Sequence, residues 1–356
     1  MVTGKFSGRL GLQQRVLPSY RVPFFDLLAG SCEGGMSLFA GLAMEAESVK
    51  AGNLQIANYQ SGENVHLFGG AFYLCYQKGL LNWLTDWNPD ALIMEANPRY
   101  LATPSAVKWM HARGRKVIGW GLGAPVRSGK MIWPRFVNQF DALISYSQRG
   151  ADEYAALGFP REKIFVAHNS VAPRPTLNVQ RSTFNVQPTI IFIGRLQARK
   201  RVDWLLRCCA EMESKPRLVI VGDGPEREKL QALAKDVYPA AEFVGAKHGA
   251  ELTPYFLQAD LFVLPGTGGL AVQEAMAHGL PVIVAKGDGT QDDLVRAGNG
   301  WQIPPEDYGT LVQVTREALS DVSRLRRMGE ESLRIVTEEI NIEKMVESFV
   351  RALNSI

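Results

Sequence analysis

The sequence has no long apolar run, and its first residues do not resemble a secretory signal. Its 356 residues contain no uninterrupted apolar stretch near the roughly 18 to 20 residues that a membrane-spanning helix needs. The first residues, MVTGKFSGRLGLQQRV, lack the apolar core of a signal peptide. We therefore expect a cytoplasmic protein, whose contact with a membrane would be peripheral and at its inner face.

Residue types that bind metals are scarce. Four cysteines and five histidines occur, without the spacings of a metal or redox site, and the sequence has no Asp-x-Asp pair. We therefore expect no metal and no other cofactor. The cysteines are expected to be reduced and structural; they are Cys32, Cys75, Cys208 and Cys209.

The sequence has only a small excess of charge of one sign, with a net charge of +3. Its distribution is uneven, because residues 1–170 hold 17 Lys and Arg against 12 Asp and Glu, whereas the remainder holds 22 against 24. A basic first half favours an anionic partner such as a membrane surface or a lipid phosphate. The other interpretation is an ordinary solvated surface, and no nucleic-acid partner is expected.

What is present is an alternation of short apolar runs with amphipathic segments, in two blocks. A chain of this length suits two domains. Strands alternating with helices imply parallel sheets joined by right-handed crossovers, so we predict an α/β fold of two doubly wound domains. In the first half, strands are predicted at 8–14, 35–42, 91–95, 116–121 and 142–146, an edge strand at 65–68 and a helix over 73–83.

Composition suggests the domain boundaries. Residues 173–189 hold three prolines among small polar residues, which is typical of a linker. The linker would separate an N-terminal domain, residues 1–172, from a second domain over 190–335. Residues 336–356 are expected to form a helix that packs back on the N-terminal domain.

The most informative segment is LFVLPGTGGLAVQEAMAHGLPVIVA, residues 261–285. A strand ends at Pro265, a loop containing Gly266, Gly268 and Gly269 follows, and a helix begins. A helix start offers unpaired amides to an anion, and glycines let a phosphate approach the backbone. Glu274, about one turn into the helix, is placed to accept hydrogen bonds from a ribose. The alternative is that the glycines only turn the chain before a buried helix.

Two cations favour the ligand-binding interpretation. Arg195 follows the predicted strand at 190–194, and Lys200 precedes the next helix, where strand ends of open α/β sheets form their ligand crevice. Both could neutralise a diphosphate by charge-assisted hydrogen bonds; the alternative is that they are surface charges. The segment VIVGDGPER argues against a dinucleotide cofactor, because Arg227 stands where the third glycine of that fingerprint is needed.

The order GRLxxxK, GDGP, FVG, GLxxxEAMAxGxPVI and GNGWQIPPED, within residues 163–307, resembles the nucleotide-sugar-binding half of the retaining glycosyltransferases of family 4. The resemblance implies the GT-B fold, two Rossmann-like domains facing a cleft. It implies that the cations Arg195 and Lys200 hold the donor diphosphate and serve catalysis, and that Glu274 binds the ribose. The remaining implied donor contacts are Gly194, Phe243, Val244, Gly245, Gly266, Thr267, Gly268, Gly269 and Leu270.

Two positions depart from the family's pattern. Many members carry a first glutamate eight positions before the second, where this chain has Gly266. Many also carry a histidine near the end of a strand that faces the donor, where this chain has GWGLG at 119–123. The loop PGTGGL resembles a subset that lacks the first glutamate, which implies that amides from Thr267 to Leu270 contact the sugar.

The function implied is retaining, metal-independent transfer of a hexose from a nucleotide diphosphate donor to a glycan or lipid-linked acceptor. Uridine diphosphate, as in UDP-glucose, is the expected carrier. Three alternatives stay open: a nucleotide-sugar epimerase, a catalytically silent nucleotide-sugar binder, and a dinucleotide oxidoreductase.

The acceptor side is expected in the first half. Gln14 and Arg15 stand where the first predicted strand passes into its loop, and Glu95 and Asn97 stand at another strand end. Residues 127–136 mix Arg and Lys with Trp and Phe, which suits either a loop at a membrane surface or ordinary packing.

Overall fold

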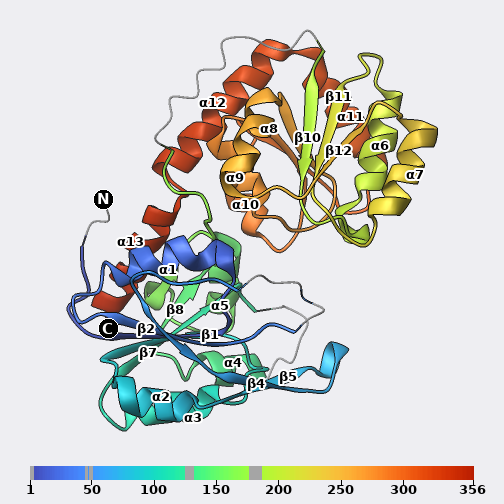
Figure 1. The fold of residues 1–356 in the computed structure, drawn as a ribbon. Helices are drawn as coiled ribbons and strands as arrows, with labels where there is room; N and C mark the ends of the chain where they lie inside the picture. Colours follow the sequence, from blue (N-terminus) through green and yellow to red (C-terminus); the bar gives the residue numbers. More distant parts are fainter. Residues whose placement is uncertain (1–3, 45–46, 48–50, 125–131, 176–186) are drawn as a thin grey trace. The chain divides into compact units, whose positions relative to one another are not determined.

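The chain forms two compact units, one of residues Met1–Val171 with Ile342–Ile356 and the other of residues Ala172–Asn341. The computed structural model describes residues 4–44, 47, 51–124, 132–175 and 187–356 (Figure 1). Residues 176–186, most of the predicted linker, and residues 127–131 of the predicted membrane-surface loop lie outside this range.

The first unit is built on a seven-stranded parallel sheet with the order β3-β2-β1-β6-β7-β8-β9. The strand order reverses between β1 and β6, and such a switch point is where open α/β sheets hold their ligands. The strands are β1 (Leu10–Val16), β2 (Met36–Gly41), β3 (Asn58–Ser61), β6 (Ala91–Glu95), β7 (Lys116–Gly121), β8 (Ala142–Ser145) and β9 (Ile164–Val166).

Apolar side chains on both faces of this sheet are covered by helices. One face packs on α1 (Val22–Ala29) and α13 (Ile342–Asn354), where Phe24, Trp120 and Phe349 meet with ring centroids 4.9 to 5.7 Å apart. The helices of the other face are α2 (Leu80–Trp87), α3 (Thr103–His111), α4 (Ile132–Val137) and α5 (Gln148–Ala156). Figure 1 shows α1 and α13 on one side of the sheet, and α2 and α3 on the other.

The helix predicted over 73–83 is wrong. Residues Leu74–Lys78 form strand β5, which pairs antiparallel with β4 (Glu63–Leu67) in a separate hairpin. Cys75 and Gln77 are buried while Tyr76 and Lys78 are exposed, which is the period of two that a strand requires. Gly79, at φ 88°, ends the strand, and α2 follows. The strand predicted at 65–68 therefore belongs to this hairpin, and the edge of the main sheet is β3.

The second unit is built on a six-stranded parallel sheet with the order β12-β11-β10-β13-β14-β15. Its order reverses between β10 and β13. The strands are β10 (Thr189–Ile193), β11 (Arg217–Val221), β12 (Glu242–Gly245), β13 (Leu261–Leu264), β14 (Val282–Ala285) and β15 (Gly300–Ile303).

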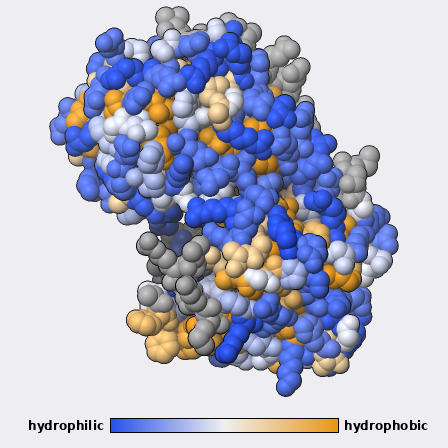
Figure 2. Space-filling view, turned by 180° about the vertical axis from the view of Figure 1, so that it is seen from behind, coloured by the Kyte–Doolittle hydropathy of each residue, from blue (hydrophilic) through white to orange (hydrophobic). Residues whose placement is uncertain are grey.

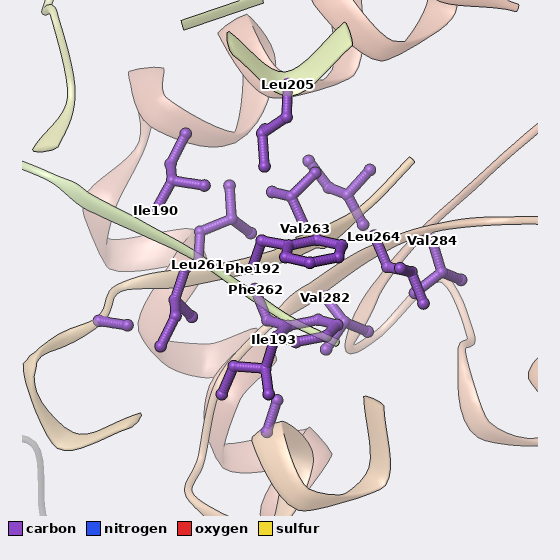
Figure 3. Packing of buried hydrophobic residues seen from close by; sticks show 14 of the residues in the cluster. Ile190, Phe192, Ile193, Leu205, Leu261, Phe262, Val263, Leu264, Val282 and Val284 are labelled. Atoms are coloured by element: carbon purple, nitrogen blue, oxygen red, sulfur yellow. The ribbon is translucent and has the colours of Figure 1, made fainter. Parts of the chain in front are cut away.

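Helices cover both faces of the second sheet as well. Figure 1 shows α6, α7 and α11 on one side and α8, α9 and α12 on the other. Figure 3 shows Phe192, Phe262 and neighbouring strand residues packed together, with Leu205 of α6 above them. The helices are α6 (Val202–Glu211), α7 (Arg227–Val237), α8 (Thr253–Gln258), α9 (Ala271–Ala277), α10 (Thr290–Leu294), α11 (Tyr308–Ser320) and α12 (Val322–Glu338). Short 3-10 turns lie at Ser19–Arg21, Gly70–Phe72, Arg161–Lys163, Ala198–Lys200 and Gly249–Leu252.

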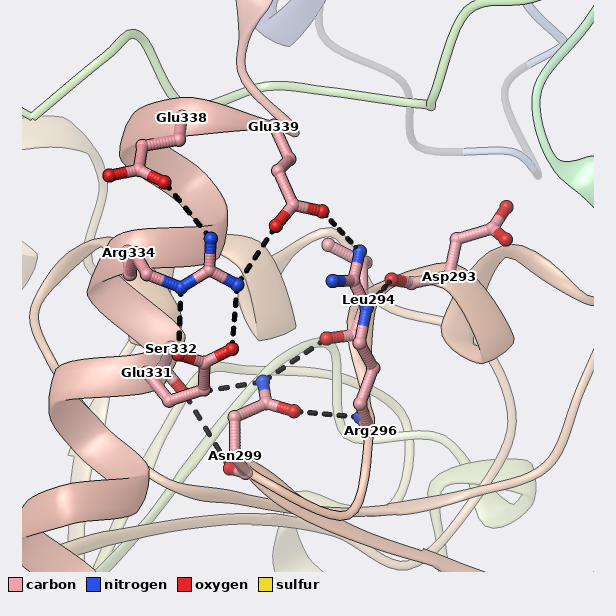
Figure 4. Close-up of polar contacts among 9 residues, drawn as sticks. All are labelled: Asp293, Leu294, Arg296, Asn299, Glu331, Ser332, Arg334, Glu338 and Glu339. Carbon is pink, nitrogen blue, oxygen red and sulfur yellow. Dashed lines mark hydrogen bonds and ion pairs between the residues drawn. The ribbon is translucent and has the colours of Figure 1, made fainter.

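A polar cluster holds the end of α12 against the loop before β15 (Figure 4). Arg334 pairs with Glu331 at 2.7 Å and with Glu338 and Glu339 at 2.9 Å. Glu339 also pairs with Arg296 at 2.6 Å. Networks of exposed charges stabilise more than isolated pairs do, so this cluster anchors the chain shortly before it leaves the unit at Asn341.

The cysteines are reduced, as expected, since all four are buried free thiols. Trp133 packs edge to face on Phe136, with ring centroids 6.2 Å apart, and is partly buried against the core of the first unit, which favours ordinary packing for this residue. In the described part of the chain, no helix combines the length and apolar character needed to cross a bilayer.

Candidate functional site

The predicted donor residues of the second unit gather at its switch point. Arg195 follows the carboxyl end of β10, and the loop containing Gly266 to Leu270 follows the carboxyl end of β13. Because β10 and β13 are hydrogen-bonded neighbours in a parallel sheet, both connections emerge at the same edge. These two connections therefore lie side by side at one edge of the sheet.

Lys200 joins the two sides of the switch point. Its side chain is 6% exposed, and its ammonium donates hydrogen bonds to the carbonyl of Thr267, at 2.8 Å, and to that of Gly268. An ammonium has three donor hydrogens, so one remains for a ligand. Among the described residues, no ion pair with a carboxylate is recorded for Lys200. The predicted coupling between this lysine and the glycine loop is thus a direct contact.

The surroundings of Lys200 make its charge sensitive to pH. Burial and the neighbouring Arg199 guanidinium lower the pKa of Lys200 to about 8. The recorded partners of these two neighbouring cations are the carbonyls of Thr267 and Gly268 and the side-chain oxygen of Gln197, all of them neutral, so an anion is favoured there. A diphosphate bound there would supply the missing opposite charge.

Arg199 is a site residue that the sequence reasoning missed. Its guanidinium donates to the Thr267 carbonyl at 3.2 Å, and its own carbonyl accepts from the Thr267 amide at 3.2 Å. The side chain is exposed. The only signal for it in the sequence was its place one residue before Lys200.

The glycine loop packs closely on this basic segment. A Cβ built on Gly266 would lie 2.0 Å from the Arg199 carbonyl oxygen and 2.5 Å from the Cα of Lys200. Gly268 has a φ of 69°, in the left-handed region that favours glycine. The chain then enters α9, whose N-cap is Leu270. Gly266 is therefore required by backbone contact, independently of any ligand.

Glu274 lies in the first turn of α9, as predicted. Its side chain is half-buried, and burial raises the pKa of its carboxyl above the usual value. Within the described ranges, no hydrogen bond or ion pair engages this carboxylate. A desolvated carboxylate of this kind gains most from a ligand that donates hydrogen bonds, such as a diol.

The glycines of GDGP hold two loops of this edge together. A Cβ on Gly222 would lie 1.9 Å from the Gly194 carbonyl oxygen, so these backbones touch. The Leu196 amide donates to the Asp223 carbonyl at 2.9 Å. Arg227, at the position of the missing third glycine, pairs with Asp223 at 3.1 Å. These contacts explain the glycines without a dinucleotide.

The residues expected beside the nucleotide base lie on the next strand outward. Phe243, Val244 and Gly245 are the last residues of β12 and are partly buried. The Gly222 amide, just after β11, donates to the Gly245 carbonyl at the end of β12 at 2.8 Å. This bond joins the ends of β11 and β12 at the same edge of the sheet as the end of β10. Strand ends from β12 to β13 therefore line up along one edge.

The predicted acceptor residues lie at the switch point of the first unit. Gln14 and Arg15 belong to β1, which continues to Val16, so the loop predicted for them is wrong. The Arg15 amide donates to a Glu95 carboxylate oxygen at 2.7 Å, across the reversal between β1 and β6. The Arg15 guanidinium pairs with Glu47 at 2.6 Å.

Burial shapes the chemistry of these acceptor-side residues. It raises the pKa of Glu95 to about 7, against the opposing effects of the Arg15 amide and of the cations Arg15 and Arg21. A carboxyl group with such a pKa can exchange a proton near neutral pH. Gln14 is 7% exposed and bonds the Gln13 carbonyl at 3.3 Å. Asn97 is half-buried and accepts from the Arg99 amide at 3.1 Å.

Residues 187–321, which contain the donor-side residues, match the family model described as Glycosyl transferases group 1. A GDP-mannose-dependent alpha-mannosyltransferase of Corynebacterium glutamicum is 37% identical over 221 residues, 58% of this chain and 51% of that protein. The protein of the same name from Mycobacterium tuberculosis is 33% identical over 185 residues, 49% of this chain and 47% of that protein. The chain thus matches about half the length of these curated relatives.

Solved structures match over nearly the whole chain. The Anabaena protein Alr3699/HepE, in complex with UDP, aligns with a TM-score of 0.72 at 15% identity, over 98% of this chain and 100% of that one. The lipopolysaccharide outer core galactosyltransferase WaaB, in its apo form, aligns with a TM-score of 0.71 at 16% identity, over 98% and 99%. The predicted GT-B fold, with its two Rossmann-like sheets, is confirmed.

Proposed function

We propose that this protein is a glycosyltransferase that moves a hexose from a nucleotide diphosphate donor to a glycan or lipid-linked acceptor. The observation that supports this most strongly is the contact of the buried Lys200 ammonium with the carbonyls of Thr267 and Gly268. It gathers positive charge and glycine amides at the switch point, where a diphosphate leaving group needs both.

In the proposed reaction, the bond between the anomeric carbon and the diphosphate oxygen breaks while the acceptor oxygen attacks the same face. The charge that develops on the diphosphate is stabilised by Lys200 and Arg195, and the departing diphosphate takes the acceptor proton. Retention of configuration is part of the proposal. The coupling constant of the anomeric proton in the product, measured by NMR, distinguishes retention from inversion.

The donor base and sugar are open to a direct test. The expectation from the family resemblance is UDP-glucose, whereas the two curated relatives above are named for GDP-mannose. A panel of UDP- and GDP-sugars, followed for release of nucleoside diphosphate with and without acceptor, decides between them. Release supports transfer, a new nucleotide sugar without release would indicate an epimerase, and binding alone would indicate a silent protein.

Replacing Glu274 by glutamine should weaken binding of the nucleoside diphosphate about tenfold to a hundredfold, the usual effect of losing hydrogen bonds to a charged group. Inorganic pyrophosphate lacks a ribose, so its binding should not change. Calorimetric titration of both ligands checks this, with Glu228→Gln, an exposed glutamate of α7, as the control. An equal loss of affinity for both ligands would show that Glu274 does not bind the ribose.

Metal independence is also part of the proposal, because Lys200 and Arg195 would supply the counter-charge that a divalent ion supplies elsewhere. Nucleoside diphosphate release should therefore stay within about twofold after excess EDTA, since no catalytic charge is removed. Restoration of a lost rate by Mg²⁺ or Mn²⁺ would contradict this prediction.

A further inference from the structure

The tip of the β4–β5 hairpin exposes aromatic side chains. Phe72 and Phe68 are 80% and 77% exposed, the highest values among the large apolar residues that the structure describes as exposed. In Figure 2 an orange patch lies at the lower left, where the hairpin projects in the reversed view of Figure 1. Clustered apolar surface of this kind marks a binding site in a soluble protein.

The base of the hairpin is held rigidly to the main sheet. The Asn64 side-chain amide donates to the carbonyls of Arg15, at 2.8 Å, and Leu42, at 2.9 Å. Gln77, which is 4% exposed, donates to the Gln14 carbonyl at 3.0 Å and to Asn64 at 2.9 Å. Side-chain amides with these partners fix the base, so the hairpin starts from a defined place beside the end of β1.

The backbone at the tip adopts a conformation that a phenylalanine disfavours. Phe68 has a φ of 58°, in the left-handed region, where a bulky side chain is an outlier. The mostly exposed ring gains little from packing in the free protein. Strained residues without a structural return are typical of ligand sites.

A pocket of about 390 Å³ lies at the base of this tip, lined by Phe68, Phe72, Tyr73, Leu74 and Arg99. Its volume falls within the range of about 300 to 1,000 Å³ that small-molecule sites occupy. The wall is apolar except for the Tyr73 hydroxyl and the exposed Arg99 guanidinium. Such a wall suits a hydrocarbon chain joined to one anionic group, since a guanidinium pairs with a phosphate through two hydrogen bonds.

Backbone contacts hold the two chain segments that line the pocket side by side. Residues 99–101 run beside β5, because the Cys75 amide donates to the Arg99 carbonyl and the Leu101 amide to the Cys75 carbonyl, both at 2.9 Å. The Tyr73 hydroxyl bonds His66 Nδ1 at 2.9 Å, and the charge of Arg15 acts on Tyr73. Tyr73 therefore lines the pocket and lies within electrostatic reach of Arg15.

We propose that this pocket binds the apolar chain of a lipid phosphate acceptor, with Arg99 pairing with its phosphate. The group that receives the sugar then lies on the side of Arg15 and Glu95. This inference rests on the proposed function for the identity of the ligand as acceptor. The pocket itself is testable without any donor.

The test uses decyl phosphate below its micelle concentration, titrated calorimetrically against the full-length protein, with inorganic phosphate as the comparison. Burial of several methylene groups should make decyl phosphate bind at least about thirtyfold more tightly than inorganic phosphate. The double variant Phe68→Ser, Phe72→Ser should bind decyl phosphate about tenfold more weakly than the wild type does, because the apolar wall is lost. Arg99→Gln should weaken decyl phosphate and leave decanol binding unchanged.

The matched control is the double variant Ile56→Ser, Leu81→Ser, whose apolar side chains are 63% and 41% exposed in the same unit; it should bind as the wild type does. Equal affinity of the wild type for the two phosphates, or wild-type affinity in the phenylalanine variant, would overturn the proposal. Sedimentation with phosphatidylglycerol vesicles in the absence of decyl phosphate binding would overturn it in favour of a bilayer surface.

A separate measurement keeps this inference distinct from the proposed function. Nucleoside diphosphate titrated into the same samples should bind the wild type and the phenylalanine variant equally. Failure of the nucleotide to bind the wild type would overturn the proposed function, and with it the role of the lipid as acceptor. The decyl phosphate result would still decide whether the pocket binds a lipid phosphate.

Discussion

Replacement of Lys200 by methionine should slow release of nucleoside diphosphate by about a hundredfold to a thousandfold, the usual effect of removing one positioned donor from a developing oxyanion. Methionine keeps the length of the apolar stem and removes the charge. Two consequences follow in the structure, because the carbonyls of Thr267 and Gly268 lose their ammonium partner and the diphosphate loses its buried cation. The steady-state rate of nucleoside diphosphate release from the preferred donor measures the combined effect of these two losses.

The control for Lys200→Met is Lys229→Met, which removes an ammonium that is 81% exposed and paired with Glu226 at 3.3 Å in the same unit. It should change turnover less than about twofold, because exposed ion pairs contribute little. Thermal unfolding of both variants shows whether the fold survives. A folded Lys200→Met protein with the wild-type rate would show that this lysine does not stabilise the departing diphosphate.

The same lysine predicts the dependence of donor binding on pH. Its pKa of about 8 in the free protein means that the ammonium is charged below pH 8 and neutral above it. Affinity for the nucleoside diphosphate should therefore fall as pH rises through about 8, and this fall should be absent in Lys200→Met. Folding stability should rise over the same range, because the lowered pKa of Lys200 makes the unfolded chain bind more protons than the folded one between pH 8 and the ordinary lysine pKa of 10.5.

Gly266→Glu should weaken donor binding strongly, although the resemblance to family 4 implies a glutamate at this position in many members. Any Cβ there would lie 2.0 Å from the Arg199 carbonyl oxygen, so the loop or the basic segment must shift. Overpacking of this kind destabilises by about 1 to 3 kcal/mol, and the shift separates Lys200 from Thr267. We expect donor affinity to fall by at least a hundredfold, since the cation and the amides no longer face one ligand.

Gly266→Ala separates the effect of the Cβ from that of the carboxylate. It should reproduce most of the loss, with a lower melting temperature. Gly298→Ala is the control, because a Cβ there would meet only the Glu331 side chain at 3.4 Å. Donor binding or transfer improved by Gly266→Glu would show that the loop accommodates the side chain and that the backbone contact is not decisive.

Much of the fold could be predicted because its signals are local. Short apolar runs, separated by amphipathic segments, correspond to most strands of the two parallel sheets. The exception is β3, whose sequence NYQS is polar and exposed along its length. The strand, glycine loop and helix around Gly266 to Glu274 are contiguous in the chain, so their order is readable from spacing and composition. The positions of Arg195 and Lys200 after a strand follow from the same local order.

The sequence by itself determined the α/β class, the glycine loop and the residue types of the donor site, because periodicity and turn chemistry act between near neighbours. Only the tertiary structure decided that 74–78 is a strand, because its backbone pairs with β4 and not within a helix of its own. Tertiary structure also brought Lys200 onto the carbonyl of Thr267, 67 residues away, and the Arg15 amide onto Glu95, 80 residues away. Strand order is set by packing across the whole sheet, and the burial that shifts the pKa of Lys200 and Glu95 exists only once that sheet has formed.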